Sequence, residues 1–393
     1  MKRSHKKILT THVGALPGPP EATSNDLSDQ QLGLVVDDVV AKQVASGIDI
    51  VNEGEWAKGG SFGEYFGARL SGFERGEDPY AIATLVAERQ DWSEFADFYK
   101  KASDNGTLFE QTGTTKVRWA TREPPRTVCR AAIEYVGAAA LEREIGALRS
   151  ALEKHGNHQA FLTSTAPACI ALGRTNEFYK SDEEFVFAIA DAMRTEYEAI
   201  ANAGLFVYVD DPFLAAMWDG PGRAMGLKAY KAYWAVRIEA LNHALARIPE
   251  EQIGFHVCWG SWHGPHAHDI PFADIVDLML KIKAQRYLFE AANARHEHEY
   301  VIWETVKLPT GKILVPGVVS HATTLIEHPE LVAQRIRRFA RIVGPENVIA
   351  STDCGLGLRC HPQIAWAKLR ALSEGAALAS RQLGLSMKAV SAG

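Results

Sequence analysis

Short apolar runs alternate along this chain with stretches whose apolar residues recur at helical spacing. Eight such runs stand out in the 393 residues: Lys7–His12, Ile48–Asn52, Gln159–Thr163, Leu205–Asp210, Gln252–Val257, Arg286–Phe289, Lys312–Val319 and Asn347–Thr352. Amphipathic helical patterns lie between most of them, the clearest being Glu184–Ala203, Leu227–Ile248 and Pro329–Val343. A repeated strand–helix order implies a parallel sheet, and eight units predict an α/β fold, one (β/α)8 TIM barrel spanning residues 1–393. An open doubly wound sheet is the competing arrangement, but no G-x-G-x-x-G motif opens the first unit.

The interval between the second and third runs is too long for one helical connection. It predicts an insertion of about residues 75–135, placed between strands 2 and 3 over the mouth of the barrel. Within it, Glu77–Lys101 is acidic and aromatic-rich and is expected to be helical, whereas Gln111–Thr127 reads as irregular or hairpin-like. Ala138–His155 has the pattern of a helix that leads back into the barrel.

The composition excludes several classes of protein. A hydrophobic content of 47% and a charged content of 23% are those of a globular protein, and the net charge of −6 argues against a nucleic-acid partner. No run of about 18 apolar residues predicts a membrane span. Five cysteines in a chain of this length do not form a disulfide framework, which favours a reducing cytoplasm with thiols available for metal. The outer helices of a barrel are available to a second copy, so a homo-oligomer is an open expectation without a specific interface residue.

Every predicted strand ends in polar residues, and active sites of such barrels lie at the carboxyl ends of the strands. In chain order, these polar residues are Thr11, His12, Glu53, Glu55, Thr163, Ser164, Thr165, Asp210, Asp211, His256, Cys258, Glu290, Ser320, His321, Asp353 and Cys354.

His256 and Cys258 stand at positions i and i+2 of one predicted strand, so their side chains point to the same face. Alone they could be a buried histidine and a packing cysteine, but Cys354 ends another strand at the same mouth. An imidazole and two thiolates suit zinc better than magnesium or calcium. Glu290 ends a further strand and is either a fourth ligand or an ordinary carboxylate paired with Arg295.

The charge of such a site predicts its chemistry. Zinc(II) with two thiolates and one carboxylate carries about −1 by formal counting. A metal in that environment activates water poorly and is better suited to holding another thiol as a nucleophilic thiolate. The pattern therefore favours alkyl transfer to sulfur over hydrolysis.

Other chemistry-bearing residues have plainer interpretations. Solvated positions are expected for the loop and charged-segment histidines His263, His266, His268, His296 and His298. Glu55 and Asp210 follow apolar runs, where a carboxylate needs a partner; each is either in a structural salt bridge or in a clamp for a ligand amine or hydroxyl. Gly59–Gly63 matches G-x-S-x-G, but the nearest predicted strand ends about nine residues earlier, so a flexible glycine loop is the preferred interpretation.

Taken together, these motifs resemble the catalytic barrel of cobalamin-independent methionine synthase and its single-barrel relatives, which include epoxyalkane:coenzyme M transferase. The segments that carry the resemblance cover most of the chain: Leu9–Pro17, Gly54-Glu55, Glu64–Gly67, Leu162–Pro167, Val209–Pro212, His256–Cys258, Phe289-Glu290 and Asp353–Leu356. The order H-x-C, lone Glu and D-C-G is highly specific.

The resemblance implies a role for each matched residue. It implies that zinc is held by His256, Cys258, Glu290 and Cys354. Glu55 and Asp210 match carboxylates that hold the substrate amino group, and His321 lies near the position of a histidine proposed as proton donor to the leaving group, with local spacing that differs by about one residue. With the strand-end residues, the expected substrate-binding set is Glu55, Asp210, Thr11, His12, Ser164 and Trp259, and the catalytic set is His321, Asp210 and Glu55.

Two departures from the family pattern bear on the substrates. Ala15 stands where the synthase usually has serine, and the chain has room for one barrel where the full synthases have two. The expected reaction is transfer of a methyl or other alkyl group from a small-molecule donor, for example a methyl-folate, to a zinc-bound thiol such as homocysteine. An epoxide-opening thiol transferase, a zinc hydrolase or deaminase, and a non-catalytic thiol-binding barrel remain as alternatives; the absence of P-C-x-x-C disfavours the deaminase.

Overall fold

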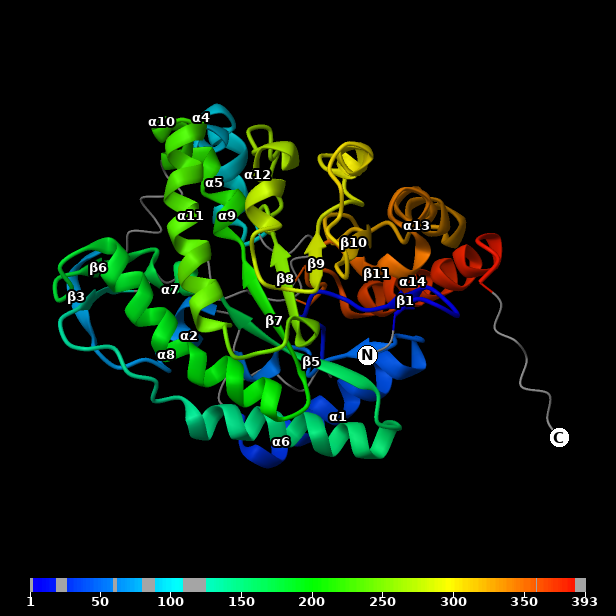
Figure 1. The fold of residues 1–393 in the computed structure, drawn as a ribbon, viewed down its shortest axis with the longest axis horizontal. Helices are drawn as coiled ribbons and strands as arrows, with labels where there is room; N and C mark the ends of the chain where they lie inside the picture. Colours follow the sequence, from blue (N-terminus) through cyan, green and yellow to red (C-terminus); the bar gives the residue numbers. More distant parts are fainter. Residues whose placement is uncertain are drawn as a thin grey trace.

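The barrel is formed by eight parallel strands (Figure 1). The computed structural model describes residues 3–18, 27–58, 62–79, 89–108, 125–357 and 359–385. Its barrel strands are β1 (Leu9–Thr10), β2 (Ile50–Val51), β5 (Gln159–Thr165), β7 (Phe206–Asp211), β8 (Ile253–Val257), β9 (Arg286–Phe289), β10 (Ile313–Val319) and β11 (Ile349–Thr352). They lie in the order β1-β11-β10-β9-β8-β7-β5-β2, and each falls on one of the eight predicted runs, so the predicted barrel is confirmed.

The seam between β1 and β2 is joined by hydrogen bonds outside the regular ladders. The backbone N–H of Asp49 donates to the carbonyl of Thr10 at 3.1 Å, and the Thr11 hydroxyl donates to the carbonyl of Ile50 at 3.1 Å. Inside the barrel, alternate residues of the strands form an apolar cluster that consists of Leu9, Val13, Ile50, Phe161, Phe206, Tyr208, Leu288, Ile313, Val315 and Ile349. The barrel is therefore a packed core, and chemistry is confined to its ends.

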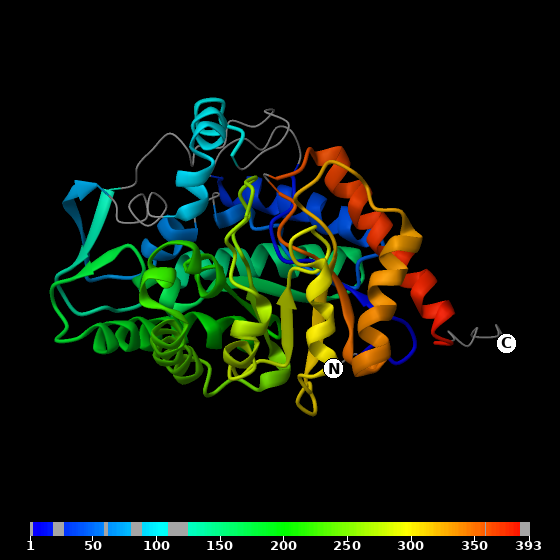
Figure 2. The same cartoon turned by 90° about the horizontal axis from the view of Figure 1, so that it is seen from above.

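Helices surround the strands, with α1 against α6 and α13 against α14 (Figures 1 and 2). They are α1 (Asp29–Ala45), α6 (Ala138–His155), α7 (Pro167–Ala171), α8 (Asp182–Asn202), α9 (Phe213–Ala216), α10 (Arg223–Met225), α11 (Leu227–Ala244), α12 (Phe272–Met279), α13 (Pro329–Val343) and α14 (Pro362–Gln382). Their starts follow from local sequence: Ser28 and Gln31 form a capping box on α1, and proline occupies the first turn of α13 and α14. The helices predicted over Glu184–Ala203, Leu227–Ile248 and Pro329–Val343 are α8, α11 and α13.

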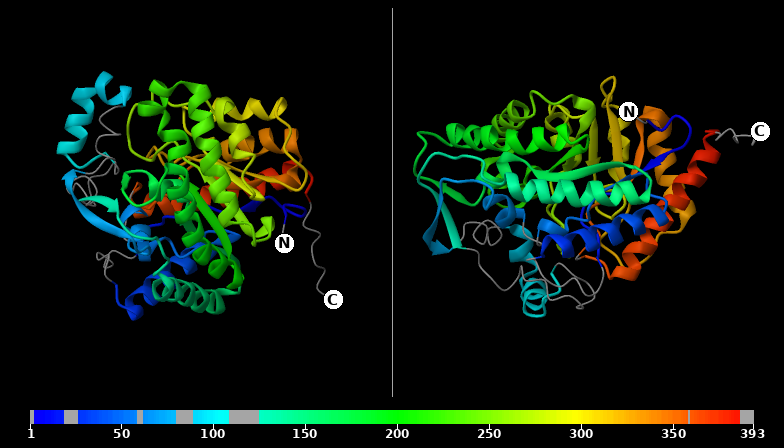
Figure 3. Two further views of the ribbon diagram at one scale, coloured as in Figure 1. Left: turned by 60° about the vertical axis from the view of Figure 1, so that its left-hand side comes forward. Right: turned by 90° about the horizontal axis from the view of Figure 1, so that it is seen from below.

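The insertion between β2 and β5 contains short helices and two strands of a small second sheet, whose third strand follows β5 in the chain. Its helices are α2 (Phe62–Gly67), α4 (Gln90–Glu94) and α5 (Ala96–Asp104), and α6 leads back to the barrel as predicted. Strand β3 (Phe73–Pro79) pairs antiparallel with β4 (Pro125–Cys129), and β6 (Arg174–Asn176) pairs parallel with β4. Figure 3 shows α4 and α5, in cyan, standing outside the ring of barrel helices.

Two predictions for the insertion need correction or lie outside the described residues. Glu77–Lys101 was expected to be helical throughout, but its first residues belong to β3, because they pair with β4, a contact that helical spacing cannot reveal. Most of the hairpin-like Gln111–Thr127 segment, and Gly59–Ser61 of the G-x-S-x-G match, lie outside the described residues. Within the described part of the chain, no helix is long and apolar enough to cross a membrane.

Candidate metal centre and active site

Three buried side chains meet where β8 and β11 end. The donor atoms of His256, Cys258 and Cys354 all lie within 4.8 Å of one another, and the two sulfur atoms are 3.8 Å apart. A tetrahedral site with metal–sulfur bonds of about 2.3 Å has sulfur atoms roughly 3.8 Å apart. The spacing of the two thiols is therefore the spacing that zinc requires.

The two thiols are hydrogen-bonded to each other, and either sulfur can be the donor. The contact lowers the pKa of Cys354 to about 6, while the same contact and burial raise the pKa of Cys258 well above its ordinary value. The backbone N–H of Gly260 also donates to the Cys258 sulfur at 3.2 Å. The pair therefore loses its first proton more readily than an isolated thiol, and a divalent cation would displace the protons that remain.

Asp210, at the end of β7, fixes the ring of His256. Its Oδ1 lies 2.6 Å from Nδ1 of His256, so the ring donates from Nδ1 and directs Nε2 toward the sulfur atoms and the carbonyl of Asp353, 3.3 Å away. Burial alone would lower the pKa of His256, but the Asp210 carboxylate raises it to about 9. A carboxylate on the far nitrogen of a histidine is the usual support of a metal-ligating imidazole.

Glu290, at the end of β9, belongs to a second buried group together with His321 and Asp353, whose candidate donor atoms also lie within 4.8 Å of one another. Its Oε1 accepts from the backbone N–H of Trp259 at 3.1 Å, and its Oε2 accepts from Nδ2 of Asn293 at 2.6 Å. Burial raises the pKa of Glu290 to about 8. Two hydrogen-bond donors therefore hold the Glu290 carboxylate near the thiols of Cys258 and Cys354.

Glu55 faces the same mouth from β2. Its Oε1 accepts from the Thr163 hydroxyl at 2.6 Å, and burial, opposed by Lys58, raises its pKa to about 8, with Asp210 near enough to add to the rise. Its φ of 62° is a left-handed conformation that residues other than glycine adopt at a cost, a feature that gathers at functional sites. Two carboxylates close enough to repel each other form a site that an ammonium group would stabilise.

His321, after β10, is buried with 3% of its surface exposed, and its Nδ1 has no hydrogen-bond partner in the described part of the chain. Burial and the nearby cations Arg359 and His263 lower its pKa well below the ordinary value. The imidazole is therefore neutral at pH 7 in this state, with a nitrogen that still lacks a partner.

Several residues expected to bind substrate point elsewhere. Ser164 donates to Glu196 of α8 at 2.7 Å, on the outer side of the barrel, because β5 alternates and it is Thr163 that faces Glu55. Trp259 is 1% exposed; its indole N–H donates to the carbonyl of Ile270, and its backbone N–H donates to Glu290.

The two expected residues after β1 are also engaged in holding the fold together. Nε2 of His12 shares a hydrogen bond with Gln43 of α1 at 2.8 Å, and Gln43 in turn bonds the backbone of Asn52. The Thr11 hydroxyl donates to the carbonyl of Ile50 across the seam between β1 and β2. These two side chains therefore stabilise the amino-terminal strand, while Nδ1 of His12 has no hydrogen-bond partner among the described residues.

The sequence alone did not identify Asn293 or the structural use of His296. Asp353 accepts from the backbone N–H groups of Ala291 and Ala292 at 2.7 and 2.8 Å, and so ties the Cys354 strand end to the Glu290 strand end. His296 was expected to be solvated but is 4% exposed. Of these residues, Asn293 could have been suspected from the sequence, because it is polar and follows Glu290 by three residues, close enough to the end of β9 to reach the mouth of the barrel.

Comparisons with known proteins agree with this geometry. A family model described as the catalytic domain of cobalamin-independent synthase matches residues 127–377, a range that contains Asp210, all four predicted ligands and His321 but not Glu55. The chain is 29% identical over 220 residues to a methionine synthase from Thermococcus kodakarensis, covering 56% of this chain and 57% of that protein. It is 27% identical over 225 residues to one from Saccharolobus solfataricus, covering 56% and 59%. The matched segment thus spans little more than half the length of these curated relatives.

Solved structures show the same fold. A B12-independent methionine synthase from a Shewanella species, in complex with selenomethionine, superposes with a TM-score of 0.69 at 17% identity, over 96% of this chain and 99% of that one. A putative vitamin-B12 independent methionine synthase from Listeria monocytogenes gives a TM-score of 0.61 at 17% identity, over 94% and 98%. With the family match over most of the barrel, the chain belongs to the cobalamin-independent methionine synthase family.

Proposed function

We propose that this protein is a zinc-dependent transferase that moves a methyl group, or another alkyl group, from a small-molecule donor to a thiol. The observation that carries the proposal is the trio His256, Cys258 and Cys354, which is buried, spaced as zinc requires and oriented by Asp210. The remaining steps follow from the residues around that trio.

The donor set fits zinc on chemical grounds. It offers an imidazole nitrogen, two sulfur atoms and the carboxylate of Glu290, a mixture that soft and borderline metals prefer over magnesium or calcium. Bound zinc would supply a site at which an added thiol is held as a thiolate at neutral pH. Because two cysteines and one glutamate already donate negative charge, this environment disfavours activation of water.

We propose that the carboxylates of Glu55 and Asp210 bind an amino group of the thiol substrate, which accepts the methyl group. An ammonium between these two carboxylates would favour the ionised form of Glu55, whose pKa of about 8 in the free protein leaves it largely protonated at pH 7. Glu290 is the predicted ligand that we expect the thiol of the substrate to replace, since Trp259 and Asn293 already donate hydrogen bonds to its two oxygens.

His321 is the proton donor that we propose for the leaving group. Its free nitrogen and its position within 4.8 Å of Glu290 put it at the mouth. Because its pKa is depressed in the free protein, it needs to take up a proton once an anionic ligand lowers the positive potential around it.

For the acceptor we propose homocysteine or a related amino thiol, by analogy with the relatives named methionine synthase. A methyl-folate or another methylated small molecule would serve as donor. An epoxide is the alternative electrophile. This alternative stays open because Ala15 stands where the family usually has a serine, so part of the site for an amino-acid carboxylate differs from the family pattern. A cytoplasmic protein is consistent with free cysteines at the site.

The test is a product assay with crossed substrates. Homocysteine and 2-mercaptoethanesulfonate are each supplied with methyl-tetrahydrofolate or with epoxypropane, and thiol products are identified by mass spectrometry. A methylated thiol formed only with the methyl donor supports the proposal, whereas a hydroxyalkyl thioether formed from the epoxide supports the alternative transferase. Turnover of either donor without any thiol would contradict both and indicate a hydrolase.

A further inference from the structure

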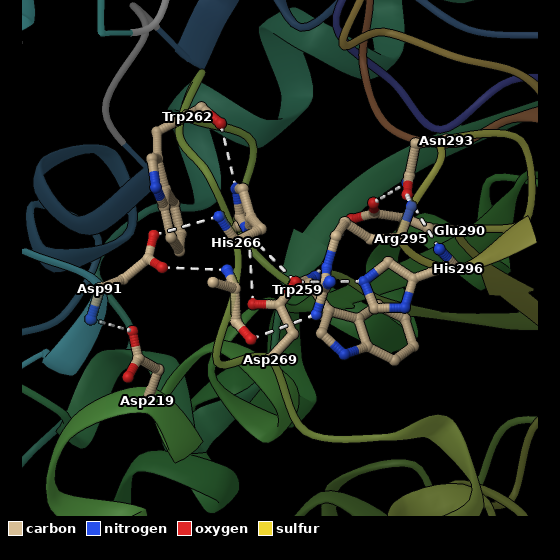
Figure 4. Close-up of polar contacts among 12 residues, drawn as sticks. Asp91, Asp219, Trp259, Trp262, His266, Asp269, Glu290, Asn293, Arg295 and His296 are labelled. Carbon is tan, nitrogen blue, oxygen red and sulfur yellow. Dashed lines mark hydrogen bonds and ion pairs between the residues drawn. The ribbon is translucent and has the colours of Figure 1, made fainter. Parts of the chain in front are cut away.

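Helix α4 of the insertion is held between two loops at the barrel mouth (Figure 4). Asp219, from the segment after β7, accepts from the backbone N–H groups of Gln90 and Asp91 at 3.1 and 3.3 Å. Asp91 in turn accepts from the backbone N–H groups of His266 and Ala267 at 3.0 and 2.9 Å. Each carboxylate thus receives two amides of the next segment, and the β7 loop, the insertion and the β8 loop are joined in series.

The contact is buried and reinforced by aromatic side chains. Asp91 is 1% exposed, and the Tyr99 hydroxyl of α5 donates to its Oδ2 at 2.6 Å. The indole N–H of Trp262, in the β8 loop, donates to the same hydroxyl at 3.1 Å, while the Arg89 guanidinium lies 4.1 Å from the centre of the Trp262 ring. Insertion and loop therefore pack as one unit.

A second set of contacts carries this anchoring toward the metal centre. Asp269 bonds the rings of both His266 and His296 at 3.2 Å, and His296 is also bound to Glu299 at 2.8 Å. The ring of Trp259 lies 4.3 Å from that of His296, centre to centre. The far end of the loop is thus fixed against the segment that follows Glu290.

The first turn of the same loop touches two of the candidate ligands. It begins at Cys258, and the N–H of Gly260 donates to the Cys258 sulfur at 3.2 Å. The N–H of Trp259 donates to Glu290 at 3.1 Å. Long irregular loops are mobile by default, so these two amides keep their aim only if the loop is tied down.

We propose that Asp91 of the insertion is a positioning residue of the metal centre: by clamping the loop after β8, it holds the backbone amides that orient Cys258 and Glu290. The inference rests on the proposed zinc site but goes beyond it, because it makes the insertion a structural part of that site. Residues that orient metal ligands from outside the ligand set affect metal affinity by about 10–100-fold. Asp91 acts through the loop and belongs at the lower end, at about 10-fold.

The experiment compares Asp91→Asn with Asp104→Asn in the full chain. The asparagine at position 91 keeps one acceptor but sets an amide NH2 against the second backbone N–H. Asp104 is an exposed residue of the same insertion that pairs with Lys100 at the surface. Three quantities are measured: the rate of zinc release to a chelating dye, the absorption spectrum of the cobalt-substituted protein, and the midpoint of thermal unfolding.

We expect Asp91→Asn to release zinc about 10-fold faster than wild type and to shift the cobalt bands, while Asp104→Asn matches wild type. A change in unfolding midpoint alone, with unchanged release and spectrum, would show a purely structural role and overturn the inference. If Asp91→Asn does not fold, Tyr99→Phe decides, since it removes only the hydroxyl that bonds Asp91 and predicts faster release in the same direction. Wild-type protein without zinc would overturn the proposed function as well, so the two failures are distinguishable.

Discussion

Replacing Asp210 by asparagine isolates the contribution of one carboxylate to zinc affinity. In the wild-type protein Oδ1 lies 2.6 Å from Nδ1 of His256, which is 2% exposed, so the bond is charge-assisted and shielded from water. A hydrogen bond to a charged group contributes about 1.5–3 kcal/mol and a neutral one about 0.5–1.5 kcal/mol. Because asparagine can still accept, the expected loss is the difference, about 1–1.5 kcal/mol, or roughly 10-fold in zinc affinity.

The sign of the effect depends on pH. In the wild-type protein without metal, His256 has a pKa of about 9, so at pH 7 its proton must leave before Nε2 can bind zinc. That competition costs about 1.4 kcal/mol per pH unit below the pKa. Asp210→Asn removes most of the competition, because the carboxylate is what raises the pKa above the value that burial imposes. At pH 7, about two pH units below the pKa of His256, this competition weakens zinc binding by wild type by about 2.7 kcal/mol, more than the advantage of about 1–1.5 kcal/mol that the carboxylate provides. The affinity gap should therefore be full above pH 9, close near pH 8 and be reversed at pH 7, where Asp210→Asn should bind zinc more tightly than wild type.

Zinc affinity is measured by competition with a chelating dye at pH 9.5 and at pH 7. Asp211→Asn is the matched control, because the Asp211 carboxylate bonds the backbone of Phe213 and Leu214 and touches no candidate ligand. It should lower the unfolding free energy and leave zinc affinity unchanged. Equal zinc affinity of wild type and Asp210→Asn at pH 9.5 would refute the assignment of Asp210 as the support of His256.

Three further changes test other parts of the structure. Arg69→Met leaves two buried glutamates without the guanidinium that bridges them, and it should lower the unfolding free energy by about 3–5 kcal/mol in chemical denaturation. Arg130→Met breaks two exposed ion pairs and should change the unfolding free energy by at most about 1 kcal/mol. Similar losses in both variants would contradict the buried network. Gly14→Ala places a Cβ 2.1 Å from Oε1 of Glu55 and should raise KM for an amino thiol several-fold, and a wild-type KM would argue against the clamp. The carboxylate partners of His296 raise its pKa in the folded protein from 6.5 to about 10, so its contribution to stability is complete below pH 6.5 and is lost as the pH rises through 10. The difference in unfolding free energy between wild type and His296→Gln should therefore shrink between pH 6.5 and 10. A constant difference would contradict the pairing.

The barrel was predictable because buried parallel strands read as unbroken apolar runs and leave polar residues at their ends. The same periodicity made the ligand trio visible, since His256 and Cys258 share a face of β8. Alternation also contained the answer for Ser164: Phe161 faces the barrel interior, so Thr163 does too, and Ser164 must face α8. Treating the strand end as one polar group missed that choice of face.

What the sequence could not provide were contacts between distant segments. His296 is buried because Asp269 and Trp259, which belong to the loop after β8, meet it in space. Likewise, nothing local to Asp91 indicates that its carboxylate caps a loop more than a hundred residues later. The indole of Trp259 was expected at the mouth because of its position, but a partner at Ile270 draws it into the core.

The most direct test of the central claim is the zinc content of the purified protein, measured together with proton release on thiol binding, in wild type and in Cys354→Ser. We expect about one zinc per chain in wild type and about one proton released per thiol bound near pH 7, with both largely lost in the variant. A protein without zinc, or one whose zinc is indifferent to Cys354 and to added thiol, would contradict the proposed zinc–thiolate site.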